Sequence, residues 1–191
     1  MTNLSIIGTG NMGQAIAAVA GKGGHTVQLL GENDQNTPVG GDVVVLAVPY
    51  PAVSDVLAKR GEQLAGKIVV DVTNPLNFET FDSLVVPADG SATAEIAAAL
   101  PQSRVLKAFN TTFAGTLAAG TVGPLTTTVL IAGDDTDAKS TLAGIVTSGG
   151  LNAIDAGSLK RARELEALGF LQLTLAANEK VSWTGGFGVV V

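Results

Sequence analysis

The sequence contains no cysteine and only one histidine, one tyrosine and one tryptophan among its 191 residues. Without cysteine the fold cannot depend on a disulfide, and this composition favours a reducing compartment. A chain of this length buries a core large enough to fold without a disulfide or a metal. Aromatic residues make up only 4% of the chain, so few rings are available to hold a tightly bound flavin.

Positive charge and long apolar runs are also scarce. The chain has 11 basic and 17 acidic residues, a net charge of −6, and its only basic cluster is Lys160, Arg161 and Arg163. This argues against a nucleic-acid partner. The mean hydropathy is +0.38, but no apolar run approaches the roughly 18 to 20 residues that cross a bilayer. The first apolar run, residues 4–7, begins almost at Met1 without a basic segment before it, so we expect no signal peptide. Together with the short apolar runs, this predicts no membrane partner and a cytoplasmic location.

Several catalytic motifs are missing as well. The chain has no YxxxK pair, no GxSxG turn and no HExxH pair, which disfavours short-chain dehydrogenase, triad hydrolase and zincin chemistry. His25 is expected in a surface turn and Lys107 at an exposed strand end. We therefore predict no catalytic side chain and no metal ligand, and the chemistry that remains needs no acid or base from the protein.

Apolar runs alternate with alanine-rich helical segments along the whole chain. Near-continuous valine, isoleucine and leucine is typical of parallel strands buried on both faces, and such runs occupy residues 4–7, 26–30, 42–48, 67–72, 104–109, 127–132 and 152–155. Helical spacing occurs between them at residues 14–22, 51–64, 93–100 and 137–146. This repetition predicts an α/β fold, a Rossmann-like, doubly wound and mostly parallel sheet in a single domain spanning residues 1–191.

Residues 155–191 are expected to form a C-terminal extension of helix and tail. Leucines at three-to-four spacing within residues 158–180 predict an amphipathic helix with Ser158 as its N-cap. This helix packs on the sheet or forms the interface of a homodimer. Residues 183–191 are expected to close the chain as a turn and a short apolar strand, with Trp183 anchoring the tail.

A glycine fingerprint follows the first predicted strand. Residues 8–13, GTGNMG, place three glycines in GxGxxG spacing at the start of a helix. In dinucleotide-binding folds the first glycine permits a tight turn, the second lets the pyrophosphate approach the backbone, and the third lets helix and strand pack closely. Amide groups at the helix start then face the phosphates. Because strand, motif, helix and second strand arrive in order within about 30 residues, the motif predicts a cofactor site formed by Gly8, Thr9, Gly10, Asn11, Met12 and Gly13.

Together with later segments, this fingerprint resembles a known family. SIIGTGNMG, DVVVLAVPYPAV, KIVVDVTNPL, VLKAFNT and RARELEALGF, in that order, resemble the oxidoreductases related to deazaflavin (coenzyme F420)-dependent NADP reductase. The cytosolic domain of the STEAP metalloreductases is similar too. The resemblance implies that NADP(H) lies across the carboxyl ends of the strands and exchanges hydride with a flavin or deazaflavin ring. It also implies cofactor contacts by Ala47, Val48 and Pro49, by Asn74, and by Ala108 and Asn110 beside the nicotinamide.

The stretch after the second predicted strand decides which nucleotide fits. At this point an acidic residue binds the ribose hydroxyls of NAD, whereas an arginine receives the 2′-phosphate of NADP. Gly31 leaves room for a phosphate, but Glu32 follows it, and no lysine or arginine occurs from residue 26 to residue 48. Thr9 and Asn33 remain as donors to a phosphate. We therefore expect NADP as the cofactor, with NAD as the alternative.

The same stretch is too short for a crossover helix. Residues 31–41 therefore predict an irregular, reduced connection that carries the chain past the first strand to its other side. The expected partial strand order is 2-1-3-4, with the switch point beside the glycine fingerprint.

The leading functional hypothesis is hydride transfer between NAD(P)H and a small-molecule acceptor of the flavin or deazaflavin type. In such a reaction the cofactors carry the chemistry, and the protein aligns them and excludes water. Two alternatives remain open: a non-catalytic NAD(P)-binding module that senses redox state, and an NAD(P)H-dependent reductase of a metal or a quinone.

Overall fold

One seven-stranded sheet runs through the computed structural model, which describes residues 1–190. Its strands are β1 (Asn3–Ile7), β2 (Thr26–Leu30), β3 (Val43–Leu46), β4 (Ile68–Asp71), β5 (Arg104–Lys107), β8 (Thr128–Gly133) and β9 (Asn152–Gly157). The strand order is β2-β1-β3-β4-β5-β8-β9. All neighbours pair in parallel except β5 and β8, which are antiparallel. The predicted mostly parallel, Rossmann-like sheet and the partial order 2-1-3-4 are confirmed.

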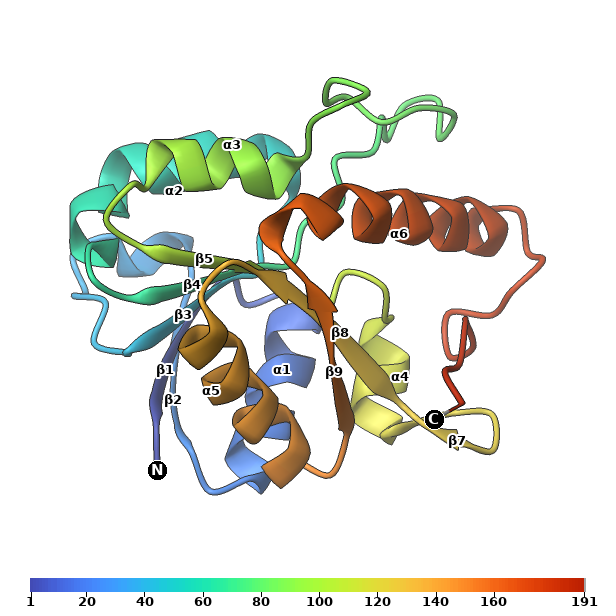
Figure 1. The fold of residues 1–191 in the computed structure, drawn as a ribbon, viewed down its shortest axis with the longest axis horizontal. Helices are drawn as coiled ribbons and strands as arrows, with labels where there is room; N and C mark the ends of the chain where they lie inside the picture. The colour runs from blue at the N-terminus through green and yellow to red at the C-terminus, as the bar shows by residue number, and fades with distance from the viewer. Residues whose placement is uncertain (191) are drawn as a thin grey trace.

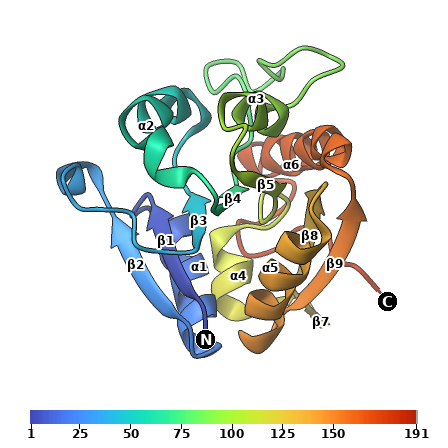
Figure 2. The ribbon, with the colours of Figure 1, turned by 60° about the vertical axis from the view of Figure 1, so that its left-hand side comes forward.

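Helices cover both faces of this sheet (Figures 1 and 2). One face carries α1 (Asn11–Lys22), α4 (Ala114–Ala119) and α5 (Thr136–Ser148), and the other carries α2 (Val53–Arg60), α3 (Ala92–Ala99) and α6 (Ala162–Ala177). Short 3₁₀ turns are η1 (Glu32–Asp34), η2 (Tyr50–Ala52), η3 (Gly61–Leu64) and η4 (Leu159–Arg161), and a small hairpin joins β6 (Thr121–Val122) to β7 (Leu125–Thr126). The fold is therefore doubly wound, with α4 and the hairpin as elements that the sequence pattern did not predict.

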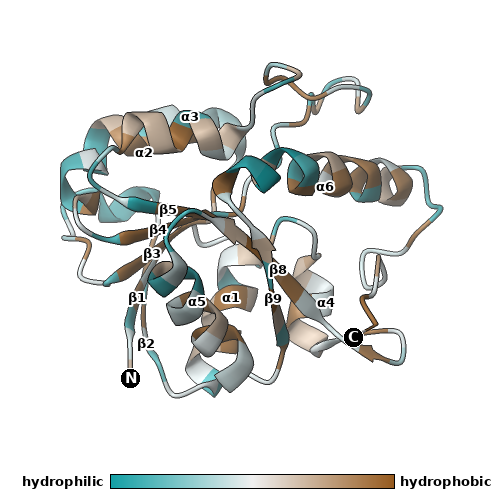
Figure 3. Ribbon diagram, viewed as in Figure 1, coloured by the Kyte–Doolittle hydropathy of each residue, from teal (hydrophilic) through white to brown (hydrophobic). Residues whose placement is uncertain are grey.

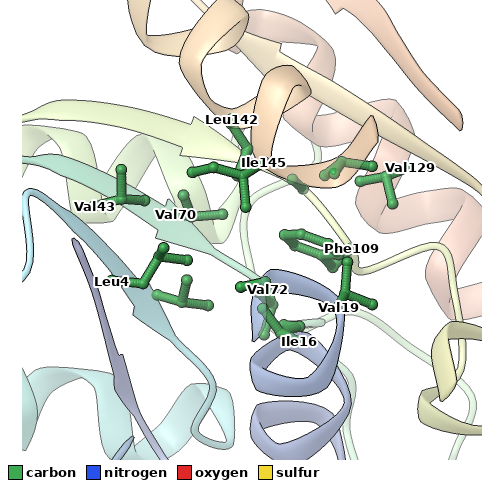
Figure 4. Close-up of a cluster of buried hydrophobic side chains, with 14 of the residues drawn as sticks. Leu4, Ile16, Val19, Val43, Val70, Val72, Phe109, Val129, Leu142 and Ile145 are labelled. Atoms are coloured by element: carbon green, nitrogen blue, oxygen red, sulfur yellow. The ribbon is translucent and has the colours of Figure 1, made fainter. Parts of the chain in front are cut away.

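The apolar runs become strands that are buried on both faces. Along β3, Val43 and Val45 belong to the core on the α1 and α5 side, whereas Val44 and Leu46 belong to the core beneath α2 and α3. Figure 4 shows side chains of the core on the α1 and α5 side, among them Val43 of β3 and Leu142 of α5. The middle residues of the central strands are correspondingly hydrophobic in Figure 3. Alternate side chains enter opposite cores, which explains why the sequence shows no polar alternation here.

The connection between β2 and β3 is irregular, as predicted. It contains only the single turn η1 before the chain enters β3 on the other side of β1. The carboxyl ends of β1, β2 and β3 therefore lie next to one another, and this arrangement places the segments that follow them around one site.

The tail differs from its prediction. Residues 183–190 form no strand, and the Phe187 amide donates to Oε1 of Gln172 at 3.1 Å. Gln172 lies on α6 and donates in turn to the Thr111 carbonyl at 3.2 Å, so a side chain of α6 holds the tail instead of a sheet edge. Trp183 does anchor this segment, because its ring centroid lies 5.0 Å from that of Phe113.

The C-terminal helix, α6, packs against α3 and β8 within the chain. A homodimer through this helix stays a prediction. Within residues 1–190, no helix combines the length and the apolar character that crossing a membrane requires.

Candidate functional site

Two of the fingerprint glycines are required by the fold itself. Gly8 has a φ of 120°, and a Cβ atom there would lie 2.1 Å from the Ala47 carbonyl oxygen. A Cβ on Gly13 would lie 2.1 Å from the Gly8 carbonyl oxygen. These contacts let the end of β1, the start of α1 and the end of β3 approach one another closely, as the sequence indicated.

Gly10 has a different reason to be a glycine. Its backbone is extended, with φ −71° and ψ −177°, and a Cβ there would have no heavy atom within 4 Å. Neither backbone strain nor packing within the protein therefore excludes a side chain at this position. Gly10 is also the N-cap of α1, without a side chain to accept a hydrogen bond from the first amides. The result is an open space in front of the helix start, where an anion is favoured.

A cleft opens in front of this loop, between the carboxyl ends of β1, β2 and β3 and the helix α2. Nine of the predicted cofactor residues line it, namely Gly8, Thr9, Gly10, Gly31, Glu32, Asn33, Ala47, Val48 and Pro49. It is also lined by residues that sequence reasoning missed, namely Ile7, Leu30, Asp34, Gln35, Ala52, Asp55, Val56, Lys59 and Arg60. Four of the missed residues, Asp55, Val56, Lys59 and Arg60, belong to α2, whose position over the β2 loop is a long-range feature without a local sequence signal.

The loop after β2 is held in a defined shape. The Gly31 amide donates to Oδ2 of Asp34 at 2.8 Å, so this carboxylate caps its own turn. Arg60, from the end of α2, is buried and donates to the carbonyls of Asp34 and Thr37. Lysine and arginine are absent from the loop itself, as the sequence shows, but α2 brings Lys59 and Arg60 to the cleft.

The other six predicted contacts do not line this cleft. Asn11 and Met12 lie in the first turn of α1, and Gly13 is buried beneath them. Ala108 lies in the core. Asn74 and Asn110 bind each other: Nδ2 of Asn110 donates to Oδ1 of Asn74 at 2.9 Å, and Nδ2 of Asn74 donates to the Asn110 carbonyl at 3.0 Å. Cofactor contact by these residues stays a prediction.

The asparagine pair lies directly beneath α6. Nδ2 of Asn110 also donates to the Leu165 carbonyl of that helix at 2.8 Å. A Cβ on Gly169 would lie 2.3 Å from Oδ1 of Asn74 and 2.9 Å from the Asn110 carbonyl oxygen. Gly169 is therefore the point at which α6 passes closely over the loops that follow β4 and β5.

The prediction for Lys107 was wrong. This side chain is not at the surface but fully buried, with Nζ 2.8 Å from Oδ2 of Asp71 and 2.9 Å from Oε1 of Glu166. Nζ also donates to the Thr73 carbonyl at 2.7 Å. These three acceptors match the three hydrogens of the ammonium group. Lys107 is thus a structural cation in a buried ionic cluster, which consists of Asp71, Lys107 and Glu166.

The buried ionic cluster contains two carboxylates and one cation, and its remaining acceptors are also satisfied. The amides of Ala92 and Thr93, at the start of α3, donate to Glu166 at 3.0 and 3.3 Å. The Thr93 hydroxyl donates to Oδ2 of Asp71 at 2.7 Å. The excess negative charge therefore faces the positive end of a helix. Since Glu166 comes from α6, Asp71 from β4 and Lys107 from β5, the cluster fastens α6 and α3 to the sheet.

The remaining candidate proton donors are engaged as well. The Tyr50 hydroxyl donates to Oε2 of Glu95, and burial, followed by that hydrogen bond and the charge of Glu95, raises the pKa of Tyr50. His25 lies in the turn after α1, where Nδ1 accepts from the Thr2 amide at 3.1 Å and Nε2 lies 3.0 Å from the Ser148 hydroxyl. No cluster of three or more metal-ligating side chains occurs among residues 1–190. The described site offers open backbone at α1 and a shaped cleft.

Comparison with known proteins adds a family likeness. The family described as "NADP oxidoreductase coenzyme F420-dependent" matches residues 31–75. The F420-dependent NADP reductase of Methanocaldococcus jannaschii is 30% identical over 166 residues, which cover 85% of this chain and 74% of that protein. Metalloreductase STEAP3 of Rattus norvegicus is 38% identical over 112 residues, 59% of this chain but 22% of that protein. A solved structure from Arthrobacter sp. FB24, provisionally assigned as an F420-dependent NADP reductase, superposes over 100% of both chains with a TM-score of 0.86 at 24% identity.

Proposed function

Because the chain belongs to the F420-dependent NADP reductase family and is an NAD(P)H-dependent oxidoreductase, we propose that it transfers hydride between NADP(H) and a deazaflavin or flavin ring. The family relationship supports NADP and a ring of this type, since relatives at 30% identity are F420-dependent NADP reductases. When bound, the nicotinamide and the acceptor ring supply the redox chemistry, and the protein supplies alignment and exclusion of water.

The observation that carries this proposal is the open space at Gly10. The protein's own atoms do not require a glycine here, because a Cβ would have no heavy atom within 4 Å and the backbone is extended. A pyrophosphate that approaches the backbone does require it, since any side chain would occupy the space between the phosphates and the amides of α1. Gly8 and Gly13, in contrast, are glycines for the fold.

The polar side chains near the sheet edge fit a reaction that needs no proton transfer by the protein. Lys107 is buried and triply bound, and the Tyr50 hydroxyl is committed to Glu95. A hydride that passes directly between two rings needs neither group. The proposal therefore assigns the protein the roles of holding NADP(H) along β1 to β3 and of admitting a small planar acceptor.

The test compares two glycine-to-alanine variants of α1. Gly10→Ala is expected to lose NADPH affinity by roughly tenfold or more because the methyl group displaces the pyrophosphate. Its free energy of unfolding is expected to fall by no more than about 1 kcal/mol, the usual cost of alanine at an N-cap. Gly21→Ala is the matched control, because a Cβ there also meets nothing within 4 Å but lies at the far end of the helix. Fluorescence titration with NADPH and thermal unfolding give both quantities.

Gly10→Ala protein that folds and binds NADPH within about twofold of wild type would contradict the placement of the cofactor. A second arm measures NADPH oxidation by the wild type with a deazaflavin of the F420 type, with free flavin mononucleotide and with a ferric chelate. Turnover is expected with the deazaflavin or the flavin. Tight NADPH binding without turnover on either ring, or turnover on the ferric chelate alone, contradicts hydride transfer to a ring.

A further inference from the structure

The cleft contains a cation that neither the fold nor the glycine fingerprint uses. Lys59 lines the cleft from the last turn of α2. In the part of the chain that the structure describes, its ammonium group forms no ion pair and no hydrogen bond. Asp55 lies one turn earlier on the same helix and also lines the cleft, but it does not form an ion pair with Lys59.

The neighbouring cation, Arg60, has a different role. It is 6% exposed, and its guanidinium donates to the carbonyls of Asp34 and Thr37 in the β2 loop. A guanidinium committed in this way is a clamp on the loop and not a mobile ligand. Arg60 is therefore a positioning residue, which holds the loop next to α2 and next to Lys59.

Of the two acidic side chains in the β2 loop, Glu32 and Asp34, the second opposes a phosphate less than the sequence suggests. The Asp34 carboxylate accepts the Gly31 amide at 2.8 Å, so one of its oxygens is turned back onto its own turn. The ideal Cβ position of Gly31 lies 3.4 Å from the methyl group of Thr9 and 3.6 Å from its hydroxyl. A hydroxyl donor and a glycine without a side chain thus stand together where the ribose of the nucleotide belongs.

We propose that α2, and not the loop after β2, supplies the positive charge that recognises the 2′-phosphate of NADP(H), with Lys59 as the contacting residue. The assignment rests on the proposed binding of NADP(H) and adds its specificity determinant. Lysine binds phosphate as a flexible point charge, so a side chain from the wall opposite the loop is suited to this task. The apolar Val56 and Ala52 of the same wall are placed to cover the adenine.

The experiment measures dissociation constants for NADPH and NADH on the wild type and on three variants. Lys59→Ala is expected to weaken NADPH binding roughly tenfold, the loss of one charge-assisted contact, while NADH binding stays within about twofold. Lys59→Glu is expected to reduce NADPH affinity further. Lys180→Ala is the control, since it removes the same charge from an exposed position beyond the end of α6 and should change neither constant. Because Lys59 is exposed, the thermal midpoints of all variants should match the wild type.

The outcomes separate this assignment from the proposed function. If the wild type binds NADPH but Lys59→Ala binds both nucleotides as the wild type does, the assignment of Lys59 is wrong and the proposed function stands. Equal weakening of NADPH and NADH also rejects it, because a contact with the 2′-phosphate cannot affect NADH. Wild-type protein that binds neither nucleotide contradicts the proposed function itself. Added salt should weaken the NADPH contact in the wild type more than in Lys59→Ala, since the charge pair is exposed to screening.

Discussion

Two polar regions lie along the same edge of the sheet, and they differ in how their polar groups are used. The nucleotide cleft, after β1 to β3, leaves the start of α1 uncapped and Lys59 unpaired among the described residues. The buried ionic cluster, at the carboxyl ends of β4 and β5, gives the ammonium of Lys107 three acceptors and each carboxylate several donors. Open donors indicate a place for a ligand, whereas satisfied ones indicate a fastening within the fold.

Removal of Lys107, the cation of the buried ionic cluster, should cause the largest loss in the free energy of unfolding. Lys107→Met leaves Asp71 and Glu166 buried without their counter-charge, and breaking a buried ion pair in this way costs about 3–5 kcal/mol. The expected result is a loss of that size in the free energy of unfolding, measured by urea denaturation followed by circular dichroism. Lys180→Met, at an exposed position, is the control and should stay within about 0.5 kcal/mol of wild type.

The double variant Lys107→Met, Glu166→Gln tests the cause of this loss. It removes one of the two uncompensated charges, so it should be more stable than Lys107→Met alone if charge burial is responsible. A loss below about 1 kcal/mol for Lys107→Met would show that the cluster does not fasten α6. No recovery in the double variant would show that charge burial is not the cause of the loss.

A smaller effect is expected at the closest approach between α6 and the loops beneath it. Gly169→Ala places a methyl group 2.3 Å from Oδ1 of Asn74, and such overpacking costs about 1–3 kcal/mol. The matched control is Gly144→Ala in α5, where a Cβ meets nothing within 4 Å. Alanine in a helix interior is favoured over glycine by up to about 1 kcal/mol, so Gly144→Ala should stabilise. We expect Gly169→Ala to lower the thermal midpoint and Gly144→Ala to raise it. Equal stabilisation by both substitutions would disprove a tight contact at Gly169.

The sequence predicted the cleft better than the cluster, for physical reasons. Strands buried on both faces must be continuously apolar, and a phosphate loop must place its glycines at fixed spacing, so both leave local patterns. Lys107 and Glu166 meet only because α6 returns over the sheet (Figure 1), and no pattern near Lys107 indicates that contact. The hydrophilic first turns of α6 in Figure 3 suggest a solvated surface, although Glu166 is fully buried.

The same reasoning applies to the cations of the cleft. Residues 26–48 contain no lysine or arginine, and Lys59 and Arg60 enter the site only through the packing of α2 on the β2 loop. The tail was predicted to end in a short apolar strand, yet the Phe187 backbone amide donates to Oε1 of Gln172 instead of to a neighbouring strand. A side-chain partner on a distant helix thus replaced the strand pairing that local propensity favoured.

The smallest effect is expected at the surface ion pair between α5 and β9, which provides a contrast to the buried cluster. The hydrogen bond from Lys139, followed by the Gly157 amide, lowers the pKa of Asp155 below its ordinary value of 3.8. Asp155 therefore contributes stability that is present above pH 3.8 and is lost as the pH falls through its lower folded-state pKa. The side chain of Asp155 is 55% exposed, so solvent screening limits this contribution to about 0.5 kcal/mol.

Asp155→Asn should consequently lower the free energy of unfolding slightly at pH 7, and the difference from wild type should disappear well below pH 3.8. Urea denaturation of both proteins at neutral and at acidic pH, at low and at high salt, measures this. The difference at pH 7 should shrink with added salt because the pair is exposed to solvent. Lys107→Met should remain destabilised at high salt, since its partners are shielded from ions. A salt-insensitive loss in Asp155→Asn would place this pair with the buried cluster and remove the distinction between surface and interior charge in this fold.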